Sequence, residues 1–212
     1  MRKRLTAVLL LLLLAGVQPL EGVAAEKQRL KGQASWMGED QHGKQTASGK
    51  PFDMFGFAAA HRTLPFGTVV KVTNVNNGKN VYVTICDRGP YHGDRVIDIS
   101  QKAARHLGII DAGVARVKLD VVADQTGKPV DPREGFFIRL RQVKSTADGI
   151  RLVRRLEQRG IPASRVIRRT EKGSQPFVGV GPYRRFSDVS RVAERIAREH
   201  PGVEIITASA DI

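Results

Sequence analysis

Two short segments of alternating apolar and polar residues, 68–74 and 80–86, constrain the fold more than any other part of this 212-residue chain. An alternation with a period of two is typical of a β-strand. The residues between the two segments include the pair Asn77-Gly78, which favours a tight turn between antiparallel strands. The sequence therefore predicts a β-hairpin in the first half of the chain.

Two polar residues mark the ends of this hairpin. His61 precedes the first strand and Asp87 ends the second, so the hairpin would bring an imidazole and a carboxylate to one end of a barrel. Counting back by twos from Asp87 gives apolar residues only, so Asp87 shares the inward-facing side of its strand. A carboxylate at the rim of an apolar barrel suits acid/base catalysis, whereas an Asp before Arg-Gly-Pro also suits a turn without a catalytic role.

The first 25 residues have the pattern of a secretory signal peptide. A basic start at residues 2–4 precedes an apolar stretch at 5–17, and the small residues Val23-Ala24-Ala25 suit cleavage. The apolar stretch is too short to span a membrane, and the single cysteine, Cys86, lies too deep in the chain to accept a lipid after cleavage. We therefore expect a periplasmic protein with no membrane anchor in its mature chain.

The chain has a formal net charge of +14, and its second half is especially basic. Residues 135–212 contain sixteen lysines and arginines against eight aspartates and glutamates. In a cytosolic protein such a basic module would suggest a nucleic-acid partner. Export argues against nucleic acid and favours anionic polymers of the cell envelope, or membrane surfaces, as partners.

A polar segment divides the chain into two parts. Residues 124–134 contain two prolines, one glycine and a single large apolar residue, which is the composition of a linker. Residues 30–123 contain short strand-like stretches and one helix at about 98–107, which Asp98 or Ser100 would cap and Gly108 would end. The strand-like stretches are 33–37, 57–60, 68–74, 80–86 and 114–122. Short strands with one helix predict a small β-barrel domain.

The part after the linker, residues 135–212, has a different pattern. The expected elements are strand 136–142, helix 146–159, strands 163–169 and 176–180, helix 187–199 and strand 203–208. The order β-α-β-β-α-β is the ferredoxin-like pattern. The sequence thus predicts a mainly β domain followed by an α+β domain.

Residues 33–122 resemble the rare lipoprotein A family, which are septal-ring lytic transglycosylases with a six-stranded double-psi β-barrel. The shared motifs occur in the family's order along the chain. They are Ala34-Ser35-Trp36, His42-Gly43, Thr46-Ala47-Ser48-Gly49, Phe52-Asp53-Met54, Ala59-Ala60-His61-Arg62-Thr63-Leu64-Pro65-Phe66-Gly67-Thr68, Val72-Thr73-Asn74, Asp87-Arg88-Gly89-Pro90 and Ile97-Asp98-Ile99-Ser100.

Residues 135–212 are similar to SPOR domains, which bind glycan strands stripped of their stem peptides at division septa. The similarity lies in the element order, in Gly160 after the first helix and in the run 180–183, Val-Gly-Pro-Tyr, before the second. It implies peptidoglycan as the partner and a septal location. Arg139 and Arg141 stand where the family more often has Gln and Gly, and they either bind anionic glycan or lie on the solvated face of a strand.

The resemblance implies a lyase that acts on naked glycan strands during cell-wall remodelling. Such an enzyme cleaves the β-1,4 bond between N-acetylmuramic acid and N-acetylglucosamine without water, because the muramic 6-hydroxyl attacks its own anomeric carbon. One carboxyl group can donate a proton to the leaving oxygen and accept one from the hydroxyl. No cofactor is implied, and the five histidines show no metal-ligand spacing.

The family's functional Glu, His and Asp fall on Lys50, His61 and Asp87. Lys50 departs from the pattern, since an ammonium cannot replace a carboxylic acid as proton donor at neutral pH. Placed near Asp87, it would also favour the ionised carboxylate. Three alternatives remain open: Asp87 acts as the only acid, Lys50 points outward, or another carboxylate substitutes for the Glu. The candidates for this substitute are Glu39, Asp40 and Asp53.

Trp36, Arg88 and Lys50 are the candidate substrate-binding residues. The flat face of Trp36 suits stacking on a pyranose ring, and packing inside the barrel is the alternative role. Met37 follows Trp36 where the family usually has Tyr, which would remove one aromatic platform.

Three functions therefore compete. The first is a glycan-cleaving lyase that uses Asp87 and His61. The second is a catalytically silent glycan-binding protein, which Lys50 favours. The third is a cysteine peptidase built on Cys86 and His61, but a strand position beside Asp87 lacks the positive surroundings that ionise a catalytic thiol.

Overall fold

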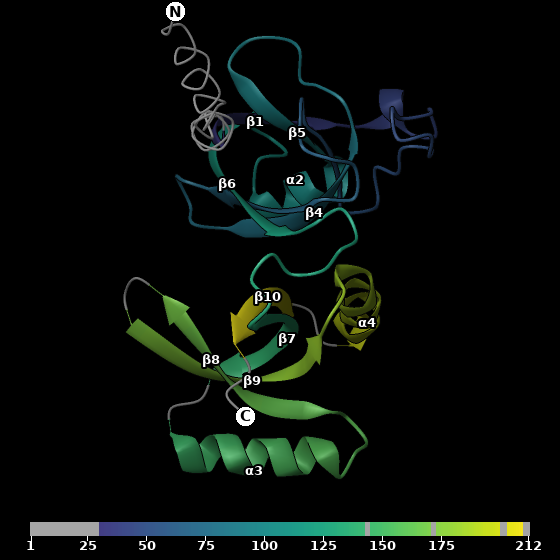
Figure 1. Cartoon of the computed structure of the whole chain (residues 1–212). Coiled ribbons are helices and arrows are strands. Elements are labelled where there is room, and N and C mark those ends of the chain that lie inside the picture. The colour runs from purple at the N-terminus through teal and green to yellow at the C-terminus, as the bar shows by residue number, and fades with distance from the viewer. Residues whose placement is uncertain (1–29, 143–144, 171–172, 200–202, 210–212) are drawn as a thin grey trace, which may run out of the picture.

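The computed structural model describes residues 30–142, 145–170, 173–199 and 203–209, arranged as two β-sheet units joined by a short connection (Figure 1). The signal peptide predicted for residues 1–25 lies outside these ranges. Within them, every helix is too short or too polar to cross a membrane.

The first unit is a closed barrel of six strands. These are β1 (Lys31–Met37), β2 (Ala58–Ala60), β3 (Val69–Asn74), β4 (Asn80–Asp87), β5 (Arg95–Ser100) and β6 (Ala115–Ala123). Around the barrel they follow the order β1-β5-β2-β4-β3-β6, with parallel pairs β1/β5 and β2/β4. A short 3-10 helix, η1 (Glu39–Gln41), and one α-helix, α2 (Gln101–Leu107), complete the unit. The predicted six-stranded barrel is confirmed.

The predicted hairpin is formed by β3 and β4, which pair antiparallel with Val72 opposite Val81. The residues of β4 that alternate inward, Val81, Val83 and Ile85, are all buried in the barrel core. Gly78 in the turn has a φ of 71°, a conformation that glycine adopts without steric cost. Asp87 is the last residue of β4 and is partly buried.

The sequence analysis missed one strand and placed the start of the helix too early. Residues 95–100 form β5, and α2 begins at Gln101 rather than near residue 98. Ser100 caps the helix by accepting a hydrogen bond from the amide of Ala103 at 3.3 Å, and Gly108 ends it with a φ of 71°. β5 ends at Ser100, the residue that caps α2, so the local sequence does not distinguish the strand from the start of the helix. The pairing partners of β5, β1 and β2, are distant in the chain.

The second unit is a four-stranded antiparallel sheet with two helices, and a pair between Ser209 of its last strand and Ile167 closes the sheet. Its elements are β7 (Glu134–Gln142), α3 (Thr146–Glu157), β8 (Ala163–Thr170), β9 (Gly173–Tyr183), α4 (Phe186–Glu199) and β10 (Glu204–Ser209). The strand order β10-β7-β9-β8 and the predicted β-α-β-β-α-β sequence agree with the ferredoxin-like arrangement. Figure 1 shows α3 on the side of this sheet away from the barrel.

The two units share a hydrophobic core. Val69 and Tyr82 lie on the outward sides of β3 and β4, and both are buried against residues of the second unit that include Phe136 and Phe186. The ring of Tyr82 stacks on Phe186 with a centroid separation of 6.1 Å. The amide of Phe186 also donates to the carbonyl of Gly127 in the connecting segment at 2.9 Å. The short connection therefore joins two packed units.

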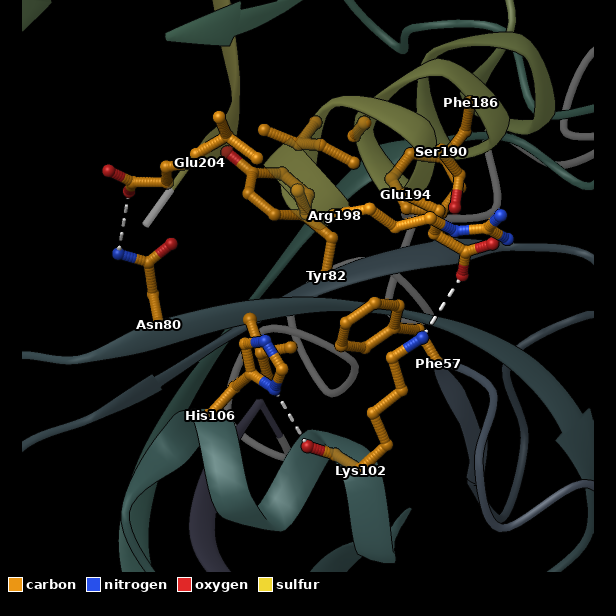
Figure 2. Close-up of a pocket in the computed structure, with 15 residues that line it drawn as sticks. Phe57, Asn80, Tyr82, Lys102, His106, Phe186, Ser190, Glu194, Arg198 and Glu204 are labelled. Carbon is orange, nitrogen blue, oxygen red and sulfur yellow. Dashed lines mark hydrogen bonds and ion pairs between the residues drawn. The ribbon is translucent and has the colours of Figure 1, made fainter. Parts of the chain in front are cut away.

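Polar contacts lie on either side of a crevice of about 440 Å³ between the units (Figure 2). Lys102 of α2 pairs with Glu194 of α4, with 3.1 Å between Nζ and Oε1. Asn80 of β4 donates to Glu204 of β10 at 3.4 Å. The Lys102–Glu194 pair is solvent-exposed and contributes little to stability, so the apolar contacts dominate the interface.

Candidate active site

Asp87 lies half-buried at the end of β4 and is held by two main-chain donors. Its Oδ1 accepts hydrogen bonds from the amides of Arg88 at 2.8 Å and Ala47 at 2.9 Å. Within the described part of the chain, no hydrogen bond reaches its other oxygen, Oδ2. One carboxylate oxygen is therefore fixed by the main chain.

A hairpin-like arm, residues 43–52, brings Ala47 to Asp87. The amide of Gly43 donates to the carbonyl of Phe52 at 2.8 Å, and the amide of Thr46 donates to the carbonyl of Lys50 at 2.9 Å. The tip of the arm rests on the end of β4, because the amide of Ser48 donates to the carbonyl of Cys86 at 3.2 Å. The sequence motifs in this segment do not predict its contact with β4.

Lys50 lies at the tip of this arm, and its side chain is exposed. Among the described residues it forms no ion pair and no side-chain hydrogen bond. The three candidate substitutes for the family's Glu do not contact Asp87 in any described interaction. Glu39 and Asp40 lie exposed in η1, and Asp53 accepts a hydrogen bond from the amide of Phe55 at 2.9 Å.

His61 follows β2 and is paired with Asp87 through the main chain. Its amide donates to the carbonyl of Asp87 at 3.1 Å, so the two residues lie side by side. The imidazole is buried, and its Nδ1 accepts hydrogen bonds from the amides of Leu64 at 3.1 Å and Thr63 at 3.2 Å. A ring nitrogen that accepts hydrogen bonds is unprotonated, so the neutral ring carries its proton on Nε2.

Arg88 contacts the loop that carries His61. Its Nη1 donates to the carbonyls of Leu64 at 2.9 Å and His61 at 3.3 Å. The guanidinium carbon also lies 3.7 Å from the centre of the Phe66 ring. These contacts give Arg88 a role in holding the loop, in addition to the substrate-binding role predicted from the sequence.

Trp36 packs on the barrel. It lies on β1 opposite Ile99 of β5, is half-buried, and contacts the core cluster. A Cβ placed on Gly38 would lie 2.7 Å from Cζ3 of Trp36, so the glycine makes room for the ring. Of the two roles considered from the sequence, this environment favours packing.

Two exposed aromatic residues were missed by sequence reasoning. Tyr91, 72% exposed, lies in the loop that follows Asp87, and Phe55, 59% exposed, packs edge-on against His42. Arg62 holds the loop of Tyr91 by donating to the carbonyls of Pro90 at 2.5 Å and Arg95 at 3.1 Å. The sequence signal that could have identified Tyr91 is an aromatic residue in a polar loop directly after the candidate acid.

The surroundings of Cys86 disfavour a catalytic thiolate. Burial raises the pKa of the thiol, a hydrogen bond from the Ala59 backbone lowers it, and the charge of Asp87 raises it. The net effect is a raised pKa, so the thiol stays protonated near neutral pH. This opposes the cysteine peptidase hypothesis.

Residues 29–119 match the family model described as "Lytic transglycolase". The chain is 46% identical over 110 residues to the endolytic peptidoglycan transglycosylase RlpA of Neisseria meningitidis serogroup A, covering 52% of this chain and 46% of that protein. It is 52% identical over 108 residues to the probable endolytic peptidoglycan transglycosylase RlpA of a Synechocystis strain, covering 51% of this chain and 34% of that protein. The similarity thus spans less than half the length of these relatives.

Among solved structures, the Streptomyces papain inhibitor is 25% identical, with a TM-score of 0.34 over 42% of this chain and 91% of that chain.

Proposed function

We propose that this protein, whose residues 29–119 match a lytic transglycosylase family model, is an endolytic peptidoglycan lytic transglycosylase of the periplasm. Its substrate is the β-1,4 bond between N-acetylmuramic acid and N-acetylglucosamine. The observation that carries the proposal is the geometry of Asp87, whose Oδ1 is held by two amides while its Oδ2 accepts no hydrogen bond from the described residues.

Asp87 performs both proton transfers of the reaction. The carboxylic acid donates its proton to the glycosidic oxygen as the bond from this oxygen to the muramic anomeric carbon breaks. The muramic 6-hydroxyl oxygen forms a new bond to the same carbon, and its proton passes to the Asp87 carboxylate. The products are a 1,6-anhydro end and a free 4-hydroxyl, and Asp87 is again protonated for the next cycle.

His61 positions the reacting groups. Its Nδ1 is occupied by two amides, so the remaining Nε2–H is a hydrogen-bond donor of fixed orientation. Its main-chain hydrogen bond to Asp87 ties the ring to the acid. Arg88 maintains this arrangement through the carbonyls of His61 and Leu64.

The second unit acts as a SPOR-like module that binds peptide-stripped glycan and directs the protein to division septa. Its excess of basic residues suits an anionic strand. Arg139 is paired with Glu204, which supports a structural role for it, and the side chain of Arg141 lies outside those described. The chain divides into a barrel domain (30–123), a linker predicted at 124–134, whose last residue, Glu134, already belongs to β7, and the SPOR-like domain (135–212), preceded by the signal peptide.

A second candidate function is a catalytically silent glycan-binding protein at the septum. The observation that favours it is Lys50, which occupies the position of a functional Glu in the family. In this reading the barrel binds glycan without cleaving it.

One experiment separates the two functions. Residues 26–212 are incubated with peptide-stripped and with intact sacculi, and soluble fragments are analysed by mass spectrometry for wild type, Asp87→Asn and Lys50→Glu. Anhydro-ended fragments from wild type that disappear with Asp87→Asn support the lyase. Fragments from Lys50→Glu alone support the silent binding protein and overturn the lyase.

A further inference from the structure

Lys50 is tied closely to the candidate acid by the backbone of the arm. Its carbonyl accepts hydrogen bonds from both the amide and the hydroxyl of Thr46, at 2.9 and 2.7 Å. The next residue, Ala47, donates to Oδ1 of Asp87 at 2.9 Å. Lys50 is therefore linked to the Asp87 carboxylate by a short chain of hydrogen bonds that runs through Thr46 and Ala47.

The ammonium of Lys50 differs from the nearby guanidinium groups in its lack of protein partners. Arg62 and Arg88 donate to main-chain carbonyls around the site. Lys50 makes no ion pair or side-chain hydrogen bond within the described ranges, and its side chain is exposed. An ammonium has three donors, so Lys50 can bind an anion beside Asp87.

The muramic acid of a glycan strand carries such an anion only under one condition. Its lactyl group ends in an amide while the stem peptide is attached, and in a free carboxylate once that amide bond has been hydrolysed. The lactyl group is on the same sugar ring as the anomeric carbon that the 6-hydroxyl attacks. A residue that recognises its carboxylate must therefore lie within reach of the candidate acid, and Lys50 is on the arm whose Ala47 amide contacts Asp87.

We propose that Lys50 is a specificity residue that binds the lactyl carboxylate of muramic acid, so that the barrel itself selects peptide-stripped glycan. This proposal rests on the proposed function for the identity of the sugar. Lys50, which stands where the family has Glu, is then a site of substrate recognition.

The test uses a ligand that the enzyme cannot cleave. The disaccharide N-acetylglucosaminyl-N-acetylmuramic acid has the lactyl carboxylate but lacks the muramic-to-glucosamine bond, and its methyl ester is the matched neutral ligand. Binding to residues 26–212 is followed by the NMR shifts of the Ala47 and Arg88 amides, which bond to Asp87 and therefore report on the barrel site alone.

Three variants are compared with wild type. Lys50→Met is expected to weaken binding of the acid about three- to fivefold, the size of an exposed ion pair, and to leave binding of the ester unchanged. Lys50→Arg keeps the charge and retains the preference for the acid. Lys44→Met, which removes another exposed lysine of the same arm, is the control and leaves both affinities unchanged.

Several results would overturn the proposal. These are an equal affinity of wild type for acid and ester, an equal loss for both ligands in Lys50→Met, or the same loss in Lys44→Met. Failure of the lyase hypothesis is a separate outcome, because this assay needs no cleavage. Selective binding of the acid without release of anhydro fragments would support this role of Lys50 and contradict the lyase hypothesis.

Discussion

The main-chain amide of Ala47 donates a hydrogen bond to Oδ1 of Asp87 across 40 positions of sequence, with an N–O distance of 2.9 Å. This bond joins two segments that lie apart in the chain, the tip of an arm and the end of a strand. It fixes one oxygen of the carboxylate, and the arm that supplies the amide also carries Lys50. The candidate acid and the residue proposed to select its substrate are therefore connected through the same short arm.

Replacement of Asp87 by Asn tests the catalytic role without removing the structural one. The amide oxygen of Asn can still accept from Ala47 and Arg88, so we expect the thermal unfolding midpoint to change little. Loss of the proton donor should lower the rate of anhydro-fragment release by about 10²–10⁴-fold. Asp53→Asn, which changes a nearby carboxylate that has no described contact with Asp87, is the control and should keep full activity. Equal activity of Asp87→Asn and wild type would contradict the assignment.

Gly67 is predicted to be intolerant of any side chain. Its φ is +88°, and a Cβ there would lie 2.3 Å from the carbonyl oxygen of Gln125 in the connecting segment. Gly67→Ala should lower the free energy of unfolding by about 2–4 kcal/mol, the combined cost of backbone strain and of the clash. Gly78→Ala is the matched control, since φ is +71° but no atom lies within 4 Å, and its cost should be about 1 kcal/mol. Similar losses in urea unfolding of both variants would show that the contact with Gln125 is unimportant.

Tyr82 should stabilise the whole molecule, although it lies on the outside of the barrel. Its side chain is buried against Phe186, so Tyr82→Ala should cost about 3–5 kcal/mol. Separation of the units should also accelerate proteolysis of the connecting segment, which limited digestion and mass spectrometry would detect. Tyr91→Ala removes an exposed tyrosine and should change neither quantity. A stable, protease-resistant Tyr82→Ala variant would show that the units do not depend on this contact.

The thiol of Cys86 should react slowly with iodoacetamide at pH 8. Burial and the charge of Asp87 raise its pKa, so the reactive thiolate is scarcer in the folded protein than in the unfolded one at this pH. Because the folded state holds the proton more tightly, this group contributes stability below the pKa of the unfolded thiol, and the contribution is lost as pH rises through the folded pKa. Labelling of folded protein at pH 8 as fast as in denaturant would contradict the raised pKa.

Local sequence patterns were sufficient for some features of the fold. The alternation in β3 and β4 predicted the hairpin and the buried residues Val81, Val83 and Ile85, because successive residues of a strand point to opposite faces. The order of elements after the linker predicted the second sheet, because the apolar residues of each helix and strand there repeat with the period of that element.

The features that escaped prediction depend on partners distant in the chain. β5 is defined by its pairing with β1 and β2, while its own residues resemble the start of the following helix. The arm at 43–52 is ordered by contacts with the end of β4, and Tyr82 is buried by a second unit that its alternation pattern does not reveal. The exposure of Tyr91 follows from a loop held by Arg62.

The core shared by Val69, Tyr82, Phe136 and Phe186 has a consequence for how a polymer would be cut. If the two domains were joined by a flexible linker, a glycan strand bound to one domain could be cleaved by the other at any distance from the bound sugars. Here the packed interface sets that distance, so a strand that touches both units would meet Asp87 at a constant number of sugars from its anchor. The lengths of the released fragments would then reflect the fixed distance between the two units.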